Sequence, residues 1–249
     1  MGLPHLTGLN EAMFLKRFQL GLIHLAVAMT LVPINSTLNR VMIKEMAFSA
    51  TLVAILASLP YLLSPIQVLI GSFSDRHPLF GWRRTPYIAI GLVFCVLGVM
   101  LAPLAAFVLA DNFLMGLIFG LFAFGAWGMG FNFATVSYFS LATDLSGEKE
   151  RGSTISVMFF MMIIGIISTS LLVSRLVDPY SPQVLVRSFW IVGIIALVLG
   201  LLGLVKLEKR TFADQRDEQE RHSWRFLASS ILENKQATIF FIYLILLLI

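Results

Sequence analysis

The chain has 249 residues, of which 58% are hydrophobic and only 13% charged, and its mean hydropathy is +0.87. Soluble domains carry about a quarter charged residues, so this composition excludes an ordinary soluble fold and indicates an all-α protein that crosses a membrane several times. The net charge of +4 does not predict a nucleic-acid partner, because basic loop residues in a membrane protein mainly set its orientation.

Six charge-free runs predict six membrane-spanning helices, at residues 18–39, 46–74, 85–110, 112–143, 152–174 and 188–205. Each is close to or above the ~20 residues that a helix needs to cross a bilayer. A seventh run, 236–249, would extend only ~21 Å as a helix, short of the ~30 Å hydrocarbon core. We therefore expect a six-helix bundle in residues 1–205, a central cytoplasmic loop in 206–236 and the start of a second bundle in 237–249.

The positions of the basic residues predict the orientation of these spans. The N-terminal segment, the loops after the second and fourth spans and the central loop together hold 14 Lys and Arg residues, whereas the other side holds 4. Basic residues concentrate on the cytoplasmic side, so we expect the N-terminus and these loops in the cytoplasm. The central loop is typical of a solvated linker. Its apolar residues would also suit a helix on the membrane surface; these are Trp224, Phe226, Leu227, Ile231 and Leu232.

Glycine and proline recur within the predicted spans. Small residues at helix-contact spacing in the fourth span predict close helix packing. They are Gly116, Gly120, Gly125, Gly128 and Gly130. Prolines are predicted to interrupt the first three spans, where neighbouring helices must satisfy the freed carbonyls. They are Pro33, Pro60, Pro65 and Pro103.

The connection between the second and third spans, residues 71–87, is short and strongly charged, and we call it the hinge. Gly71 is predicted to end one helix and Pro86 to lie in the first turn of the next. The charged residues would serve as anchors to helix ends and lipid phosphates, as a conformational switch that pairs in one state and separates in another, or as both. The positions concerned are Gly71, Asp75, Arg76, Gly81, Arg83 and Arg84.

The loop after the fourth span is expected to pair with the hinge at the same membrane surface. Its charged residues are Asp144, Glu148, Glu150 and Arg151. The order of glycines, acid and bases in the hinge resembles the loop between the second and third helices of major facilitator superfamily transporters. Four residues, 77–80, stand between Arg76 and Gly81 where most members of that superfamily have one.

No predicted span carries an acid or base in its interior, which argues against a proton-coupled carrier of polar solutes. The polar side chains that remain at mid-depth are His24, Gln67, Asn132 and Ser137. A neutral imidazole there would either hydrogen-bond a neighbouring helix or ligate a metal such as the magnesium of a chlorin. Asn132 is a second candidate ligand. The single cysteine, Cys95, lies in an apolar run and predicts neither a disulfide nor a metal site.

Residues 38–45, LNRVMIKE, follow the first span at the opposite face. Arg40 and Lys44 are four residues apart and share a helical face, whereas Leu38, Val41 and Met42 face elsewhere. Taken alone, the segment predicts an interfacial anchor.

Three segments together resemble a known family. LNRVMIKE at 38–45, the run 64–88 with GSFSDRHPLFGWRRTPYI, and LATDLSGEKERG at 141–152 are similar to the PucC and LhaA family, the bacteriochlorophyll-delivery branch of the major facilitator superfamily. The resemblance extends over the whole chain. It implies a twelve-helix fold of two six-helix bundles, of which this chain holds the first and the start of the second. Its motif positions on the face opposite the hinge are Asn39, Arg40 and Glu45.

The resemblance also implies a function. We expect a membrane assembly factor for light-harvesting antenna complexes, which binds or delivers (bacterio)chlorophyll and contacts antenna polypeptides or the reaction centre. Its location would be the plasma, intracytoplasmic or thylakoid membrane of a photosynthetic bacterium. Two alternatives stay open: a conventional small-solute transporter of the same fold, and a pigment-free scaffold bound to photosynthetic complexes. The sequence contains no nucleophile elbow, phosphate-binding glycine loop or metal-ligand cluster, so we expect neither enzyme activity nor a metal site.

Overall fold

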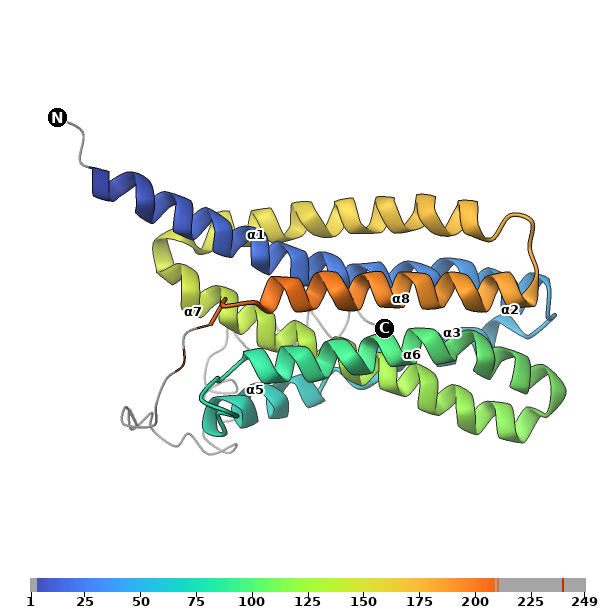
Figure 1. Cartoon of the computed structure of the whole chain (residues 1–249). Coiled ribbons are helices and arrows are strands. Elements are labelled where there is room, and N and C mark those ends of the chain that lie inside the picture. The colour runs from blue at the N-terminus through green and yellow to red at the C-terminus, as the bar shows by residue number, and fades with distance from the viewer. Residues whose placement is uncertain (1–3, 209, 211–238, 240–249) are drawn as a thin grey trace. The chain divides into compact units, whose positions relative to one another are not determined.

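The computed structural model describes residues 4–208, 210 and 239, with side chains from residue 13 onward except at 68, 69, 72, 75 and 76. Within these residues the regular structure is helical, apart from one isolated bridge between Leu79 and Trp82 (Figure 1). The predicted all-α class is confirmed. Four helical stretches are long and apolar enough to cross a membrane: Met13–Lys44, Thr85–Asp111, Phe113–Leu176 and Pro182–Leu204.

The first rod runs without a break from α1 (Pro4–Val32) through a π-helix, η1 (Pro33–Leu38), into α2 (Asn39–Lys44). The predicted interruption at Pro33 therefore takes the form of a wider helical turn, since proline has no N–H to donate to the regular ladder. The rod ends at Lys44 rather than at residue 39. In α2, Val41 and Met42 are buried while Arg40 and Lys44 are exposed, which confirms the predicted division of faces.

The second predicted span is broken into α3 (Ala50–Ala57), α4 (Leu59–Leu62) and α5 (Ile66–Arg76). Pro60 lies in the first turn of α4 and Pro65 is the N-cap of α5, so the predicted interruptions are confirmed here. The prediction that Gly71 ends the helix is wrong, because α5 continues to Arg76. The stop comes from Pro78, which disfavours helical geometry at the preceding residue, His77 (φ −124°, ψ 75°).

The remaining rods are α6 (Thr85–Asp111), α7 (Phe113–Leu176) and α8 (Pro182–Leu204). α6 begins next to Pro86 as predicted, but it continues through Pro103, so the expected interruption there is wrong. α7 contains the fourth and fifth predicted spans as two halves joined at Gly147, whose φ of 62° and ψ of −179° are accessible essentially to glycine alone. The chain reverses direction at this joint (Figure 1).

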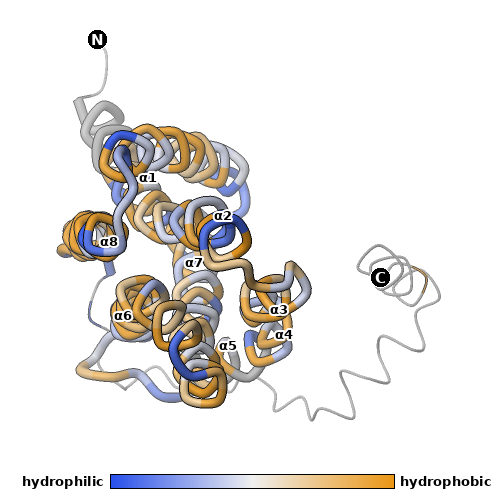
Figure 2. The backbone as a smooth tube through the Cα atoms, turned by 90° about the vertical axis from the view of Figure 1, so that its right-hand side faces the viewer, coloured by the Kyte–Doolittle hydropathy of each residue, from blue (hydrophilic) through white to orange (hydrophobic). Residues whose placement is uncertain are grey.

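α7 packs against α1, α4, α5 and α6, and α8 packs against α1 and α6. Figure 2 views the rods nearly end-on and shows them apolar along most of their length. α6 and the first half of α7 lie close together, because a Cβ added at Gly91 would lie 2.4 Å from the backbone nitrogen of Ala134, and one added at Gly130 would lie 2.2 Å from that of Cys95. This confirms the predicted close packing at Gly130, whereas Gly125 has open space around it.

Contacts along the chain separate Met1–Thr211 from Phe212–Ile249 as two compact units. The predicted central loop, 206–236, and the predicted start of a second bundle, 237–249, lie outside the described residues except at 206–208, 210 and 239. The described chain leaves α8 at Leu204, close to the predicted end of the sixth span at residue 205.

Candidate functional site

The hinge is the place where charged connections of the chain meet. α5 ends at Arg76, residues 77–84 form a turn, and α6 begins at Thr85. Gly71 lies within α5, and Asp75 and Arg76 occupy its last turn with side chains outside the described part. Gly81 lies in the turn with a φ of 83°.

Arg84 is the buried centre of the hinge, with 6% of the residue exposed. Its Nη1 donates to Ser74 Oγ at 2.8 Å, and its Nε lies 3.7 Å from Asp144 Oδ2. Asp144 comes from the connection after the fourth predicted span, so the expected pairing of that connection with the hinge is confirmed. The carboxylate and the hydroxyl replace part of the hydration that a buried guanidinium loses.

Glu208, which the sequence analysis missed, binds the amino end of α6. Its Oε1 accepts from the backbone N–H of Arg83 at 2.8 Å, and its Oε2 accepts from that of Thr85 at 2.7 Å. The Arg84 N–H lies 3.1 Å from both oxygens. Such N–H groups at a helix start lack intrahelical partners, and the helix dipole favours an anion there. In the structure the N-cap of α6 is Arg84 and no local side chain caps the helix, so the distant Glu208 takes that role.

A second contact joins the segment after α8 to the hinge. The guanidinium carbon of Arg210 lies 4.4 Å from the centroid of the Trp82 ring, within the range of a cation–π interaction. Glu208 and Arg210 therefore contact the hinge at its helix start and at its turn.

The start of α1, the hinge between α5 and α6, and the turn within α7 lie at the same end of the rods (Figure 1). Arg17 connects α1 to the second half of α7. It forms an ion pair with Glu150 and donates to Ser153 Oγ at 3.1 Å. Arg151, the next predicted position, is exposed. Arg17 and Glu150 thus link the start of α1 to the connection around Gly147, and Arg84 and Asp144 link the hinge to it.

The predicted motif Asn39, Arg40 and Glu45 lies at the opposite end of the rods. Asn39 Nδ2 donates to the carbonyl oxygen of Asn35 at 3.5 Å, while Arg40 and Glu45 are exposed. Burial, and then the charge of Glu45, raise the pKa of Tyr180 in the turn between α7 and α8. The segment after α2, which holds Glu45, and the turn between α7 and α8, which holds Tyr180, are therefore close enough to interact electrostatically.

His24 lies in α1 among aromatic rings from both halves of α7. Its ring centroid is 5.2 Å from that of Tyr138, 5.4 Å from Phe139 and 5.2 Å from Phe159. The residue is 6% exposed, and Nδ1 is buried with no hydrogen-bond partner in the part of the chain that the structure describes. A buried nitrogen without a partner costs free energy. A metal ion bound to Nδ1, or a hydrogen bond formed by Nδ1, would offset that cost.

Asn132, the second candidate ligand, is engaged in helix contacts. Its Nδ2 donates to the carbonyl oxygens of Pro60 and Gly128, each at 2.9 Å, and its Oδ1 accepts from Gln67. The amide therefore satisfies a carbonyl in α4, within the broken second predicted span, as membrane helices with internal prolines require. Its use as a pigment ligand stays a prediction.

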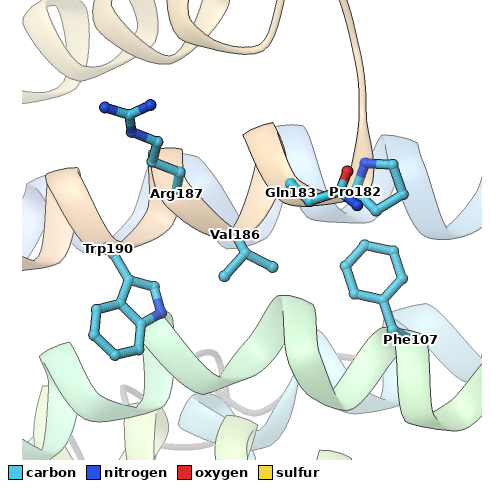
Figure 3. Close-up of a pocket in the computed structure, with 6 residues that line it drawn as sticks. All are labelled: Phe107, Pro182, Gln183, Val186, Arg187 and Trp190. Carbon is cyan, nitrogen blue, oxygen red and sulfur yellow. The ribbon is translucent and has the colours of Figure 1, made fainter.

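A groove of about 460 Å³ lies between α6 and the first turns of α8. Val186 and Trp190 point from α8 toward α6, while the Arg187 guanidinium points away from them (Figure 3). His24 is not among the lining residues, which are Phe107, Pro182, Gln183, Val186, Arg187 and Trp190. In the described residues, no group of three or more His, Cys, Asp or Glu is placed to hold a metal ion.

Comparison with known proteins decides the family. The family described as "PUCC protein" matches residues 37–249. The chain belongs to the PucC family. "Protein PucC" of Cereibacter sphaeroides is 32% identical over 222 residues, which are 84% of this chain and 48% of that protein. "Protein PucC" of Rhodovulum sulfidophilum is 30% identical over 227 residues, 88% and 50% of the two chains.

A third relative bears a different name. "Bacteriochlorophyll synthase 44.5 kDa chain" of Rhodobacter capsulatus is 31% identical over 200 residues, which are 79% of this chain and 45% of that protein. The chain spans about half the length of the curated relatives it matches. No solved structure matches it. The family resemblance inferred from the three sequence segments is confirmed, and the PucC family match begins in η1, just before the motif at 38–45.

Proposed function

We propose that this PucC-family chain is part of a membrane assembly factor for light-harvesting complexes, and that it binds or delivers bacteriochlorophyll. Family membership supports the proposal, as does the name of the relative that is called a bacteriochlorophyll synthase chain. The observation that carries it is the His24 cluster. A chlorin needs one axial donor to its magnesium and apolar contacts for its ring and tail, and a buried imidazole among aromatic side chains offers both.

The proposed cargo would be held by few groups. His24 would supply the axial nitrogen, and Tyr138, Phe139 and Phe159 would contact the ring. Phe159 is 43% exposed on the outer surface of its helix, so its side chain is the one that would move to admit a flat ligand from the lipid. Delivery would then require only that another imidazole, on an antenna polypeptide, replace His24.

The rods α1 to α8 would form the amino-terminal six-helix bundle of a major facilitator fold, with the hinge and the N-terminus in the cytoplasm. We propose no catalytic step for this bundle, in which the membrane-crossing rods supply apolar surface and a single ligating nitrogen. Its partners would be lipids and antenna or reaction-centre polypeptides.

The test is to express the full chain in a bacterium that makes bacteriochlorophyll, purify it in mild detergent, and measure chlorin per protein. We expect stoichiometric chlorin in the wild type and an approximately tenfold weaker retention in His24→Leu, equivalent to about 1.4 kcal/mol. The matched control is His77→Leu, which removes an exposed imidazole in the hinge and should retain pigment.

Absence of chlorin from the wild type would contradict the proposal and favour the pigment-free scaffold. Equal pigment in the two histidine variants would contradict the role of His24 as the axial ligand. Saturable uptake of a small polar solute by vesicles that contain the protein would favour the transporter.

A further inference from the structure

The turn within the hinge holds an aromatic residue in a backbone conformation that suits glycine. Leu79 and Trp82 exchange backbone hydrogen bonds of 2.9 and 3.0 Å, which closes a two-residue hairpin. The residues between them, Phe80 and Gly81, have φ of 56° and 83°. Tight hairpins need positive φ at both central positions, and asparagine, aspartate or glycine usually supplies it. A phenylalanine there is an outlier that calls for a reason.

The hairpin presents apolar side chains outward. Phe80 is 84% exposed and Leu79 is 37% exposed, so neither contributes much to the core of the bundle. Phe73, in the last turn of α5, is 54% exposed and stacks on His77 with ring centroids 4.2 Å apart. Phe73 at the end of α5 and Leu79 and Phe80 in the hairpin are therefore large apolar side chains exposed in the same hinge.

The base of the hairpin is fixed on several sides. Glu208 accepts the N–H groups of Arg83 to Thr85, and Arg210 lies over Trp82. The hydroxyl of Tyr87, in the first turn of α6, donates to the carbonyl oxygen of His77 at 2.7 Å. The tip is thus held at a set position relative to α6 and is not carried on a free loop.

The position of the hairpin selects its partner. The hairpin connects the end of α5 to the start of α6, and α6 is long enough to cross the membrane. The hairpin therefore lies at the boundary between the hydrocarbon core and the lipid head groups. Arg210 is exposed and lies over the Trp82 ring of the hairpin, and Lys206 is exposed four residues earlier in the chain. Cations at this level attract anionic lipid phosphates. Apolar side chains flanked by cations are the pattern of segments that bind the membrane interface.

We propose that Leu79 and Phe80 insert into the head-group layer of the adjacent leaflet, so that the hinge is anchored in lipid at its tip and in protein at its base. The partner is the lipid surface itself, and the proposal is independent of pigment binding. A protein docked on the same tip is the alternative that the experiment must separate.

The chain has one cysteine, Cys95, which is buried, so a Cys95→Ala background allows single-site labelling. A nitroxide is attached to Phe80→Cys in the full chain, in vesicles of equal parts phosphatidylcholine and phosphatidylglycerol. Its collisions with oxygen, which enriches in lipid, and with a water-soluble nickel chelate are then measured. Leu79→Cys provides an independent second position. The matched control is Lys149→Cys, an exposed polar site at the same end of the rods.

We expect the labels at 79 and 80 to collide several-fold more with oxygen than with nickel, and the label at 149 to show the reverse. Nickel access at 80 equal to that at 149 would place the tip in water and overturn the proposal. A label at 80 that is immobilised and shielded from both reagents would overturn it in favour of a protein partner.

Discussion

Removing the carboxylate of Glu208 should destabilise the bundle, because it leaves the start of α6 without its acceptor. In Glu208→Ala, three backbone N–H groups lose partners at 2.7 to 3.1 Å. Loss of an N-cap costs about 0.5–2 kcal/mol, and loss of an anion from the positive end of a helix costs about 0.3–1 kcal/mol. Glu208 is only half-buried, so water replaces part of the interaction. We expect a total of about 1–3 kcal/mol.

The conservative variant separates the two contributions. Glu208→Gln keeps one acceptor oxygen and loses the charge, so we expect about 1 kcal/mol of destabilisation. Unfolding free energies are measured by titrating the purified chain with sodium dodecyl sulfate in mixed micelles and following helical circular dichroism. The control is Glu148→Ala, an exposed carboxylate at the same end of the rods. If Glu208→Ala stays within about 0.5 kcal/mol of wild type, as ordinary surface substitutions do, the capping role is refuted.

Two glycine substitutions make further predictions, measured by the same titration. Gly130→Ala places a Cβ 2.7 Å from Cys95 Cα, so we expect a loss of about 1–3 kcal/mol as α6 and α7 are forced apart. Gly125→Ala, with no atom within 4 Å, should have little effect, and equal losses in the two variants would contradict the packing. The Cβ added by Gly147→Ala also meets no atom, but the alanine must adopt a φ of 62°. We therefore expect strain alone to lower the free energy of unfolding by about 1–3 kcal/mol. Gly152→Ala is its control, and an unchanged stability of Gly147→Ala would contradict the argument.

The sequence predicts apolar helices because a run without charge must be buried in lipid or protein. The bounds agree where α6 begins at Thr85 and where α8 ends at Leu204. They differ in the first rod, which extends from Pro4 to Lys44, and in the second run, which is broken into α3, α4 and α5. The wrong predictions concern proline and glycine. Gly71 does not end α5, which stops before Pro78. Pro103 does not break α6. A proline inside a membrane helix is tolerated when its neighbours supply the lost contacts, and the sequence does not say whether they do.

The candidate site was predictable only where it lies within local motifs. The Arg84 and Asp144 pair could be expected because both residues lie in charged connections on one predicted side. Glu208 was missed because its partners are backbone N–H groups more than 120 residues away, and backbone donors leave no trace in side-chain composition. The surroundings of His24 were also hidden, since its three ring neighbours come from two spans that meet only after the chain turns at Gly147.

The distribution of polar groups bears on what a cargo of this bundle could be. In the described residues, the ionic contacts lie at the rod ends, and at mid-depth Asn132 is engaged by Gln67 and by backbone carbonyls. The described residues also hold buried side-chain atoms without hydrogen-bond partners at that depth. One of these atoms is a nitrogen, His24 Nδ1, and the others are serine and threonine hydroxyl oxygens. A polar solute would need several groups to replace its hydration. A chlorin needs one axial donor and apolar surroundings, and for this reason we propose a lipid-soluble pigment, not a water-soluble metabolite, as the cargo.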